Sequence, residues 1–236
     1  MHDTSYARDA ANPELRLHAH TLNADEWRNL QTSYQVGDLL MPCCEASAIP
    51  KTSPYGLQFF AHAGGQCSSS PEGLWHLAGK EKVAQTAREM GIQAIIEHSS
   101  PHGWRSDVWL MVDGAPVAVE IQHSYQHIRD YRHRQARYME QGVRCLWLVM
   151  AQPYKTLLGS SGKIRWREEF DRGKWPEGEN QCVSDVPVGM LNLGQEHNPM
   201  VAGPRLYASL REVLQAFIEH RFIWDRGAWI VDGRTI

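Results

Sequence analysis

Two acidic residues lie in neighbouring apolar segments of the chain and together could bind a metal ion. Asp107 lies in residues 105–110, and Glu120 lies in residues 117–122. Asp113-Gly114 between these segments favours the tight turn of an antiparallel hairpin, which would bring the two acids together. Two carboxylates at a strand edge can hold a hard divalent cation, the kind of ion that phosphodiester hydrolysis needs. The alternative is two solvated acids at the ends of an ordinary hairpin.

The segments around this hairpin predict an α/β arrangement. Residues 72–90 predict a helix that Gly91 ends, and residues 91–97 predict a strand before the hairpin. A polar, arginine-rich segment over residues 125–141 predicts a second helix, and the apolar run 143–150 predicts a buried strand. The predicted order is therefore helix, three strands, helix, strand.

This order, with an acid in the second strand and Glu-x-Gln in the third, resembles the PD-(D/E)XK nuclease superfamily. Motifs within residues 36–150 are similar to those of its competence-associated CoiA-like family: Glu120-Ile121-Gln122-His123-Ser124, Arg134 and Tyr138 in R-x-x-x-Y, His76 and Lys80 in H-x-x-x-K, Met41-Pro42-Cys43-Cys44, and Phe59-Phe60-Ala61-His62. The resemblance implies a restriction-endonuclease-like core and a role with incoming or recombining DNA. It also implies that Asp107, Glu120 and the Ile121 carbonyl bind Mg²⁺ or Mn²⁺.

The cysteine motif departs from the family pattern. Met41 occupies the place of the first zinc-ribbon cysteine, and a closed structural zinc site needs four nitrogen or sulfur ligands. Cys44, His62 and Cys67 remain as candidate ligands, with Cys43 as an off-register neighbour. We therefore expect a degenerate zinc site.

The third strand also departs from the superfamily pattern, because Gln122 stands where most members have lysine. A neutral amide cannot supply positive charge to the transition state. Glu72, His76 and Lys80 recur every four residues and form one stripe of the first predicted helix. If that stripe faces the hairpin, Lys80 would supply the charge and His76 or Glu72 would complete the metal shell, as would Glu97 from the first strand. The alternative is a solvated helix face with a half-buried histidine.

Net charge limits how the chain would contact DNA. A formal charge of −3 over 236 residues excludes a surface coated with basic residues, so contacts must be local. The second predicted helix offers Arg129, Arg132, Arg134 and Arg137. A later run combines cations with aromatic residues, which suits phosphate contact and base stacking, or alternatively an amphipathic surface. Its members are Lys163, Arg165, Trp166, Arg167, Phe170, Arg172, Lys174 and Trp175.

The chain is expected to have three parts. These are a β-rich, degenerate zinc-ribbon-like lobe over residues 1–70, the nuclease-like core over 71–152, and an extension over 153–236. In the extension we expect loops and short strands over residues 157–204 and a helix over 206–222. No membrane span or signal peptide is expected, and five cysteines without a disulfide-framework spacing favour a reducing cytoplasm.

Two functions are compatible with these patterns. The first is a metal-dependent nuclease that hydrolyses DNA phosphodiester bonds, in which Lys80 or Gln122 positions the attacking water. The second is a catalytically degenerate nuclease fold that binds DNA or a partner. The presence of both carboxylates favours the nuclease.

Overall fold

The chain divides into two compact units, Met1–Ala78 and Gly79–Ile236. The computed structural model describes residues 6–54, 56–63, 73–101, 103–173, 181–194 and 198–232. The division differs from the expected three parts because segments after residue 152 belong to the same unit as the hairpin that carries the two acids. Within the described residues, no helix is long and apolar enough to cross a membrane.

The N-terminal unit contains short strands and one helix. Strands β1 (Tyr6–Asp9), β2 (Arg16–His18) and β3 (Leu39–Leu40) pair in the order β2-β1-β3, and η1 (Ala19–Thr21), α1 (Ala24–Ser33) and the hairpin of β4 (Ala48–Thr52) and β5 (Gln58–His62) complete the unit. Helix α1 begins at Asn23, whose side chain accepts hydrogen bonds from the N–H groups of Asp25 and Glu26. Pro50 lies inside β4, which is an edge strand, where proline is tolerated.

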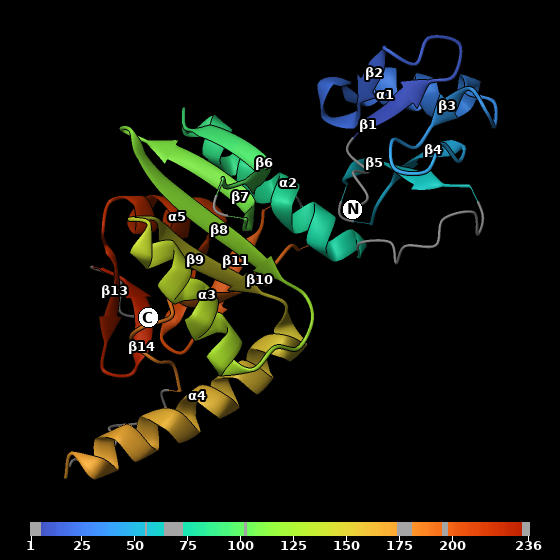
Figure 1. Cartoon of the computed structure of the whole chain (residues 1–236). Helices are drawn as coiled ribbons and strands as arrows, with labels where there is room; N and C mark the ends of the chain where they lie inside the picture. The colour runs from blue at the N-terminus through green and yellow to red at the C-terminus, as the bar shows by residue number, and fades with distance from the viewer. Residues whose placement is uncertain are drawn as a thin grey trace. The chain divides into compact units, whose positions relative to one another are not determined.

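The C-terminal unit is built on a seven-stranded mixed sheet with the order β12-β11-β10-β9-β8-β7-β6 (Figure 1). Its strands are β6 (Gln93–Ser99), β7 (Arg105–Val112), β8 (Ala115–Gln122), β9 (Arg144–Val149), β10 (Val188–Asn192), β11 (Met200–Gly203) and β12 (Leu206–Ser209). The helices are α2 (Leu74–Glu89), which begins in the N-terminal unit, α3 (Ile128–Glu140), α4 (Ala151–Asp171) and α5 (Leu210–Ile218). Strand β13 (Phe222–Asp225) pairs with β14 (Ala228–Val231) in a separate hairpin. The predicted order of helix, three strands, helix and strand is present as α2, β6, β7, β8, α3 and β9.

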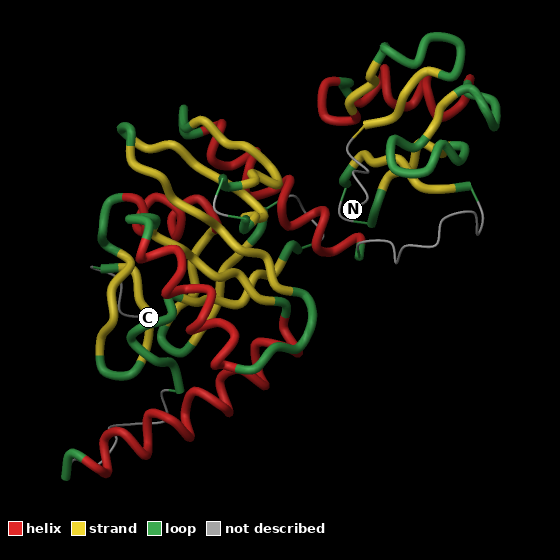
Figure 2. The backbone as a smooth tube through the Cα atoms, viewed as in Figure 1, coloured by secondary structure: helices red, strands yellow, loops and turns green. Residues whose placement is uncertain are grey.

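Helices α2 and α3 lie on opposite faces of this sheet (Figure 2). On one face, Gly79 of α2 approaches β8 so closely that a Cβ there would lie 2.8 Å from Cγ2 of Ile121. On the other face, Arg134 of α3 reaches Glu120, the neighbouring residue of β8. Successive residues of a strand point to opposite faces, so the two helices enclose the strand that carries Glu120. Glycine at position 79 permits this packing.

Two expectations for the C-terminal part are wrong. Residues 151–171 form the long helix α4 rather than loops, and Tyr154, Leu157, Ser161 and Arg165 form its buried face. The helix expected over 206–222 is limited to α5, because the residues before it pair as β12 and the residues after it pair as β13. Ser209 fixes the start of α5 through a capping box with Glu212.

Candidate active site

The hairpin of β7 and β8 brings Asp107 and Glu120 to opposed positions. The register pairs Val108 with Val119, and the two acids are the next positions along the strands. The connecting turn has positive φ at Asp113 (49°) and Gly114 (81°), as the predicted tight turn requires. At the site, Oδ2 of Asp107 accepts a hydrogen bond from the backbone N–H of Ile121 at 2.8 Å. The two acids and the Ile121 backbone therefore meet at one place.

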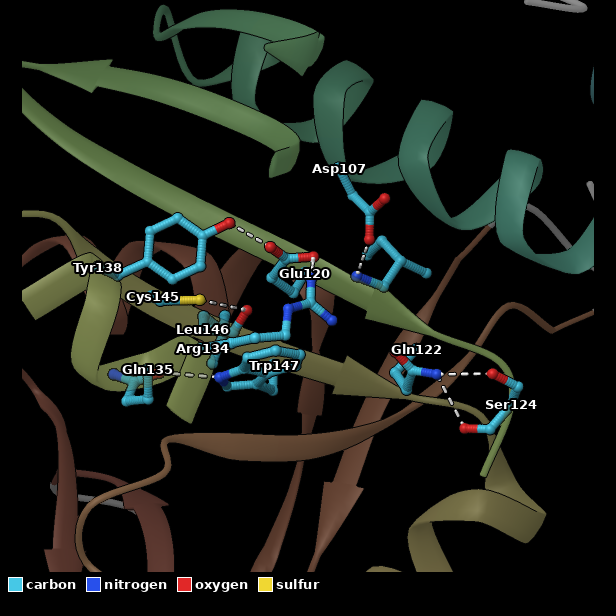
Figure 3. A network of polar contacts seen from close by, with 11 residues as sticks. Asp107, Glu120, Gln122, Ser124, Arg134, Gln135, Tyr138, Cys145, Leu146 and Trp147 are labelled. Atoms are coloured by element: carbon cyan, nitrogen blue, oxygen red, sulfur yellow. Dashed lines mark hydrogen bonds and ion pairs between the residues drawn. The ribbon is translucent and has the colours of Figure 1, made fainter. Parts of the chain in front are cut away.

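Both oxygens of Glu120 have partners on α3. Tyr138 donates its hydroxyl hydrogen to Oε1, and Nη2 of Arg134 lies 2.6 Å from Oε2 (Figure 3). Residues four apart share one face of a helix, so the R-x-x-x-Y spacing places both partners over one carboxylate. Tyr138 is a residue of the site that was not among the predicted site residues. The spacing was the signal that would have identified it.

Burial and like charge raise the pKa of Glu120. Only 2% of the residue is exposed, and this burial, together with the negative charge of Asp107, raises its pKa to about 7. Arg134 and the hydrogen bond from Tyr138 act in the opposite direction but do not outweigh these effects. Two carboxylates that repel each other in a buried place form a site that a cation would stabilise.

Arg134 is held between the sheet and solvent. Its guanidinium lies 4.6 Å above the ring of Trp147, which is the partner of Glu120 in the β8–β9 register. The indole N–H of Trp147 in turn donates to Gln135 at 2.8 Å, which fixes the ring. With 27% of its side chain exposed, Arg134 is bound to Glu120 and still reaches the surface.

The other arginines of α3 separate into two groups. Arg132 pairs with Asp185 at 2.7 Å and with Glu168 of α4 at 3.5 Å. Arg129 has 83% of its side chain exposed, and Arg137 is also exposed. These last two arginines, eight residues apart on the helix, are the ones that face solvent.

Lys80 and Glu97 form an ion pair beside the hairpin. Nζ of Lys80 lies 2.6 Å from Oε1 of Glu97, and Arg105 pairs with the other oxygen. Lys80 is 2% exposed, so the alternative of a solvated helix face is wrong for this residue. Glu97 has a positive φ of 59° and lies between the pairs Ile96–Val108 and His98–Ser106, opposite Asp107. The carboxylate of Glu97, in the strand next to Asp107, is shared by two cations, Lys80 and Arg105.

The remaining predicted residues lie near the end of β8 and on α2. The amide of Gln122 donates to the hydroxyl and the carbonyl oxygens of Ser124, at 2.9 Å each, and so fixes the chain after β8. His76 lies one turn before Lys80 on α2 and is half-buried. Glu72 lies outside the described residues.

A row of aromatic side chains, not predicted from the sequence, borders the site. Tyr138 meets Trp104 edge-on with ring centroids 4.7 Å apart, and Trp109 follows at 5.7 Å from Trp104. His98 then stacks on Trp109 at 4.6 Å. The row supports the ring of Tyr138 and, through it, the position of the Glu120 carboxylate.

The N-terminal unit gathers three metal-ligating side chains. Sγ of Cys43 lies 3.2 Å from Nε2 of His62 and 3.7 Å from Sγ of Cys44, and the ligand atoms of all three residues lie within 4.8 Å of one another. Cys67 lies outside the described residues. Met41 is fully buried beside Trp27 and Phe60, so this position now serves the core of the unit. Cys43, expected to be off-register, is part of the cluster.

Comparison with known proteins identifies the middle of the chain. Residues 72–169 match the family described as "Competence protein CoiA, nuclease-like domain". This region matches a nuclease-like domain and has mixed α/β structure, and the match supports the resemblance to the CoiA-like family that the motifs predicted.

Similarity over the whole chain is weaker than the family match. No curated protein matches the chain. Among solved structures, a protein of unknown function from Silicibacter pomeroyi, SPO1766, is similar over 59% of this chain and 80% of its own, with 17% identity and a TM-score of 0.31.

Proposed function

We propose that the chain is a metal-dependent nuclease that hydrolyses DNA phosphodiester bonds and contributes to the processing of incoming or recombining DNA. The observation that carries the proposal is the meeting of Asp107 and Glu120 in a place so buried that the pKa of Glu120 rises to about 7. Such a carboxylate pair, on adjacent strands of a restriction-endonuclease-like core, is best stabilised by a cation.

The donor set fits a hard divalent ion. Asp107, Glu120 and the Ile121 carbonyl would hold Mg²⁺ or Mn²⁺, which prefer oxygen ligands, and the ion would lower the pKa of the attacking water and neutralise phosphate charge. The N–H of Ile121 orients Asp107, and Tyr138 orients Glu120. His76 is a further candidate ligand on α2.

Most of the superfamily has a lysine at the position of Gln122. Arg134 is the cation best placed to take the role of that lysine. Its guanidinium already lies at the carboxylate pair, whereas the ammonium of Lys80 lies against Glu97. Because Trp147 supports it from below, Arg134 can turn from Glu120 to a bound phosphate without leaving its platform. We assign to Lys80 and Glu97 the support of the strand beside Asp107.

A cleavage assay tests this proposal. Plasmid and single-stranded DNA are incubated with the protein and Mg²⁺, Mn²⁺ or a chelator. We expect cleavage with either metal and none with the chelator. Cleavage that persists in the chelator would exclude the proposed metal chemistry.

One observation favours a second candidate, a degenerate nuclease fold that binds DNA or a partner. Tyr138 and Arg134 occupy both oxygens of Glu120, as in a site where protein groups take the place of the ion. Calorimetry with Mn²⁺ separates the two functions. A protein that binds DNA but not Mn²⁺, and that lacks cleavage, would be the degenerate form.

The exposed arginines of α3 are expected to contact phosphates. Replacing Arg129 and Arg137 by glutamine should weaken duplex binding equally for all sequences and reduce the slope of log K against log salt by about 1.8, because each phosphate contact contributes about 0.9. Arg28→Gln with Arg226→Gln is the control, since it removes equal charge at two other exposed sites. Fluorescence anisotropy at several salt concentrations provides the measurement. An unchanged slope in the α3 variant would remove this face from the DNA surface.

Lys80→Met is expected to destabilise the C-terminal unit. It leaves Glu97 with Arg105 alone, and loss of one partner of a mostly buried pair should cost on the order of 2 kcal/mol, less than for full burial because 20% of the Glu97 side chain is exposed. Urea unfolding measures the change. Adding Glu97→Gln should recover part of the loss, and a Lys80→Met protein as stable as the wild type would contradict the assignment.

Zinc is the proposed ion for the cysteine cluster, with Cys43, Cys44 and His62 as ligands. Cys43→Ser should weaken Zn²⁺ binding at least about 10-fold in competition with a chromophoric chelator, since a thiolate ligand is lost. Met41→Cys should not restore affinity, because position 41 lies in the core. Asp107→Asn is the control for the other metal site. Zinc binding unaffected by Cys43→Ser would contradict this ligand set.

A further inference from the structure

The outer face of α4 alternates basic and aromatic side chains. Four side chains share one face of the helix because they recur in the pattern i, i+3, i+4, i+7: Lys163, Trp166, Arg167 and Phe170. All four are exposed, Trp166 to 48% and Phe170 to 60%. We call these four residues the α4 stripe. Clustered exposed aromatic side chains mark interaction sites.

The α4 stripe is separate from the packing face of the helix. The buried residues Tyr154, Leu157, Ser161 and Arg165 lie on the other side of α4, since each residue advances about 100° at 3.6 residues per turn. In Figure 1 the second half of α4 extends beyond the strands of the sheet. The stripe therefore lies on the side of α4 opposite to its buried residues.

The charges around the α4 stripe favour an anionic ligand. Two neighbouring acids are paired with arginines, Glu168 with Arg132 at 3.5 Å and Glu169 with Arg165 at 2.8 Å. The stripe itself contains two cations and no acid. Beside it lies a hollow of about 480 Å³, lined by Gly159, Gly162, Lys163, Trp166, Arg167 and Gln181. A flat ring can approach the helix at Gly159, where no atom lies within 4 Å of the position of a Cβ.

We propose that the α4 stripe binds single-stranded nucleic acid, with bases stacked on Trp166 and Phe170 and phosphates on Lys163 and Arg167. This deepens the proposed function by naming the form of the substrate and rests on it for its role. A single strand offers both an exposed base and a phosphate at every nucleotide, which matches the alternation of the stripe. A duplex keeps its base faces stacked inside and cannot use the aromatic residues.

The distance to the site sets the length of strand required. Helix α4 begins beside the end of β8, where the N–H of Met150 donates to the carbonyl of Gln122 at 2.8 Å. The stripe lies roughly 18 to 28 Å further along the helix at 1.5 Å per residue. A single strand that occupies both places must therefore span at least this distance.

The proposal is tested by measuring nucleic-acid binding in a chelator, which prevents metal-dependent cleavage. The full-length Trp166→Ala, Phe170→Ala double variant is titrated against a labelled 25-nucleotide thymidine strand and a 25-base-pair duplex in a chelator. Stacking contributes about 1–3 kcal/mol per base, so the loss of two stacking residues should weaken single-strand binding at least about 30-fold and leave duplex binding unchanged. Tyr207→Ala, which removes an aromatic residue that is 61% exposed on β12, is the control and should change neither.

A second variant keeps the test independent of the aromatic residues. Lys163→Ala with Arg167→Ala should reduce the single-strand salt slope by about 1.4, at about 0.7 per contact. Unchanged single-strand binding in both variants, equal losses for strand and duplex, or a wild-type dimer that the aromatic variant disrupts would each overturn the proposal. Single-strand binding that depends on the stripe in a protein that never cleaves DNA would reject the nuclease and retain the stripe.

Discussion

Asp107→Asn is expected to abolish cleavage that depends on Mg²⁺ or Mn²⁺. The substitution removes one of two charged ligands from the proposed metal site, and loss of the several kcal/mol that a bound ion contributes lowers the rate on the order of 1,000-fold. Asparagine keeps an oxygen that accepts the N–H of Ile121, so the hairpin should remain folded. Alanine would leave that N–H without its acceptor at a cost of about 1–3 kcal/mol, which would mix stability with catalysis.

Asp113→Asn is the matched control for this variant. Asp113 lies in the same hairpin, is exposed, and has a φ of 49°, a conformation that asparagine tolerates. The control changes an acid to an amide without touching the site and should cleave as the wild type does. Glu120→Gln should behave as Asp107→Asn, with Mn²⁺ binding lost in calorimetry. If Asp107→Asn cleaves DNA as fast as the wild type, Asp107 is not a ligand of a catalytic metal ion.

Local sequence was sufficient to predict the hairpin and its two acids. Alternation of side chains and the Asp113-Gly114 turn fix which residues of β7 and β8 face each other, and both signals lie within a few residues. The partners of Glu120 were not predictable in this way. Arg134 and Tyr138 lie on a helix rich in arginines, and only the packing of α3 on the sheet determines which of those side chains turn inward.

Helix α4 was not predicted from the sequence because part of its buried face is polar. Two glycines, each about 1 kcal/mol less favourable than alanine, indicated loops, and the inward positions include Ser161 and Arg165 rather than apolar residues. Arg165 is buried because Glu169, one turn later, neutralises it at 2.8 Å. An apolar pattern cannot reveal a face that is stabilised by an ion pair.

The sequence predicted the helix that carries Lys80. It did not predict the ion pair of Lys80 with Glu97. The four-residue stripe predicted a cation near the hairpin, and Lys80 does lie beside it. Its partner Glu97 comes from β6 and adopts a positive φ, a conformation uncommon for a residue with a side chain. Such a local distortion depends on tertiary contacts, here the two cations that hold the carboxylate.

Arg134→Gln is expected to separate metal binding from cleavage. Removing a positive charge 2.6 Å from Glu120 should leave Mn²⁺ affinity equal or higher, because the ion no longer competes with the guanidinium for the carboxylate. Cleavage should nevertheless fall on the order of 100- to 1,000-fold, the typical effect of losing a preorganised group that stabilises developing charge. Arg134→Lys keeps the charge but not the planar stacking on Trp147 and should recover part of the rate.

Arg137→Gln is the control for the Arg134 variant, since it removes an exposed arginine one turn away on the same helix. It should leave kcat unchanged and weaken DNA binding only through the loss of a phosphate contact. Calorimetry with Mn²⁺ and single-turnover cleavage measure the two effects separately. If Arg134→Gln instead cleaves faster than the wild type, the guanidinium blocks metal binding by Glu120. The positive charge at the phosphate must then come from another residue. If Mn²⁺ binding and cleavage fall together, Arg134 holds the site in shape and does not act on the phosphate.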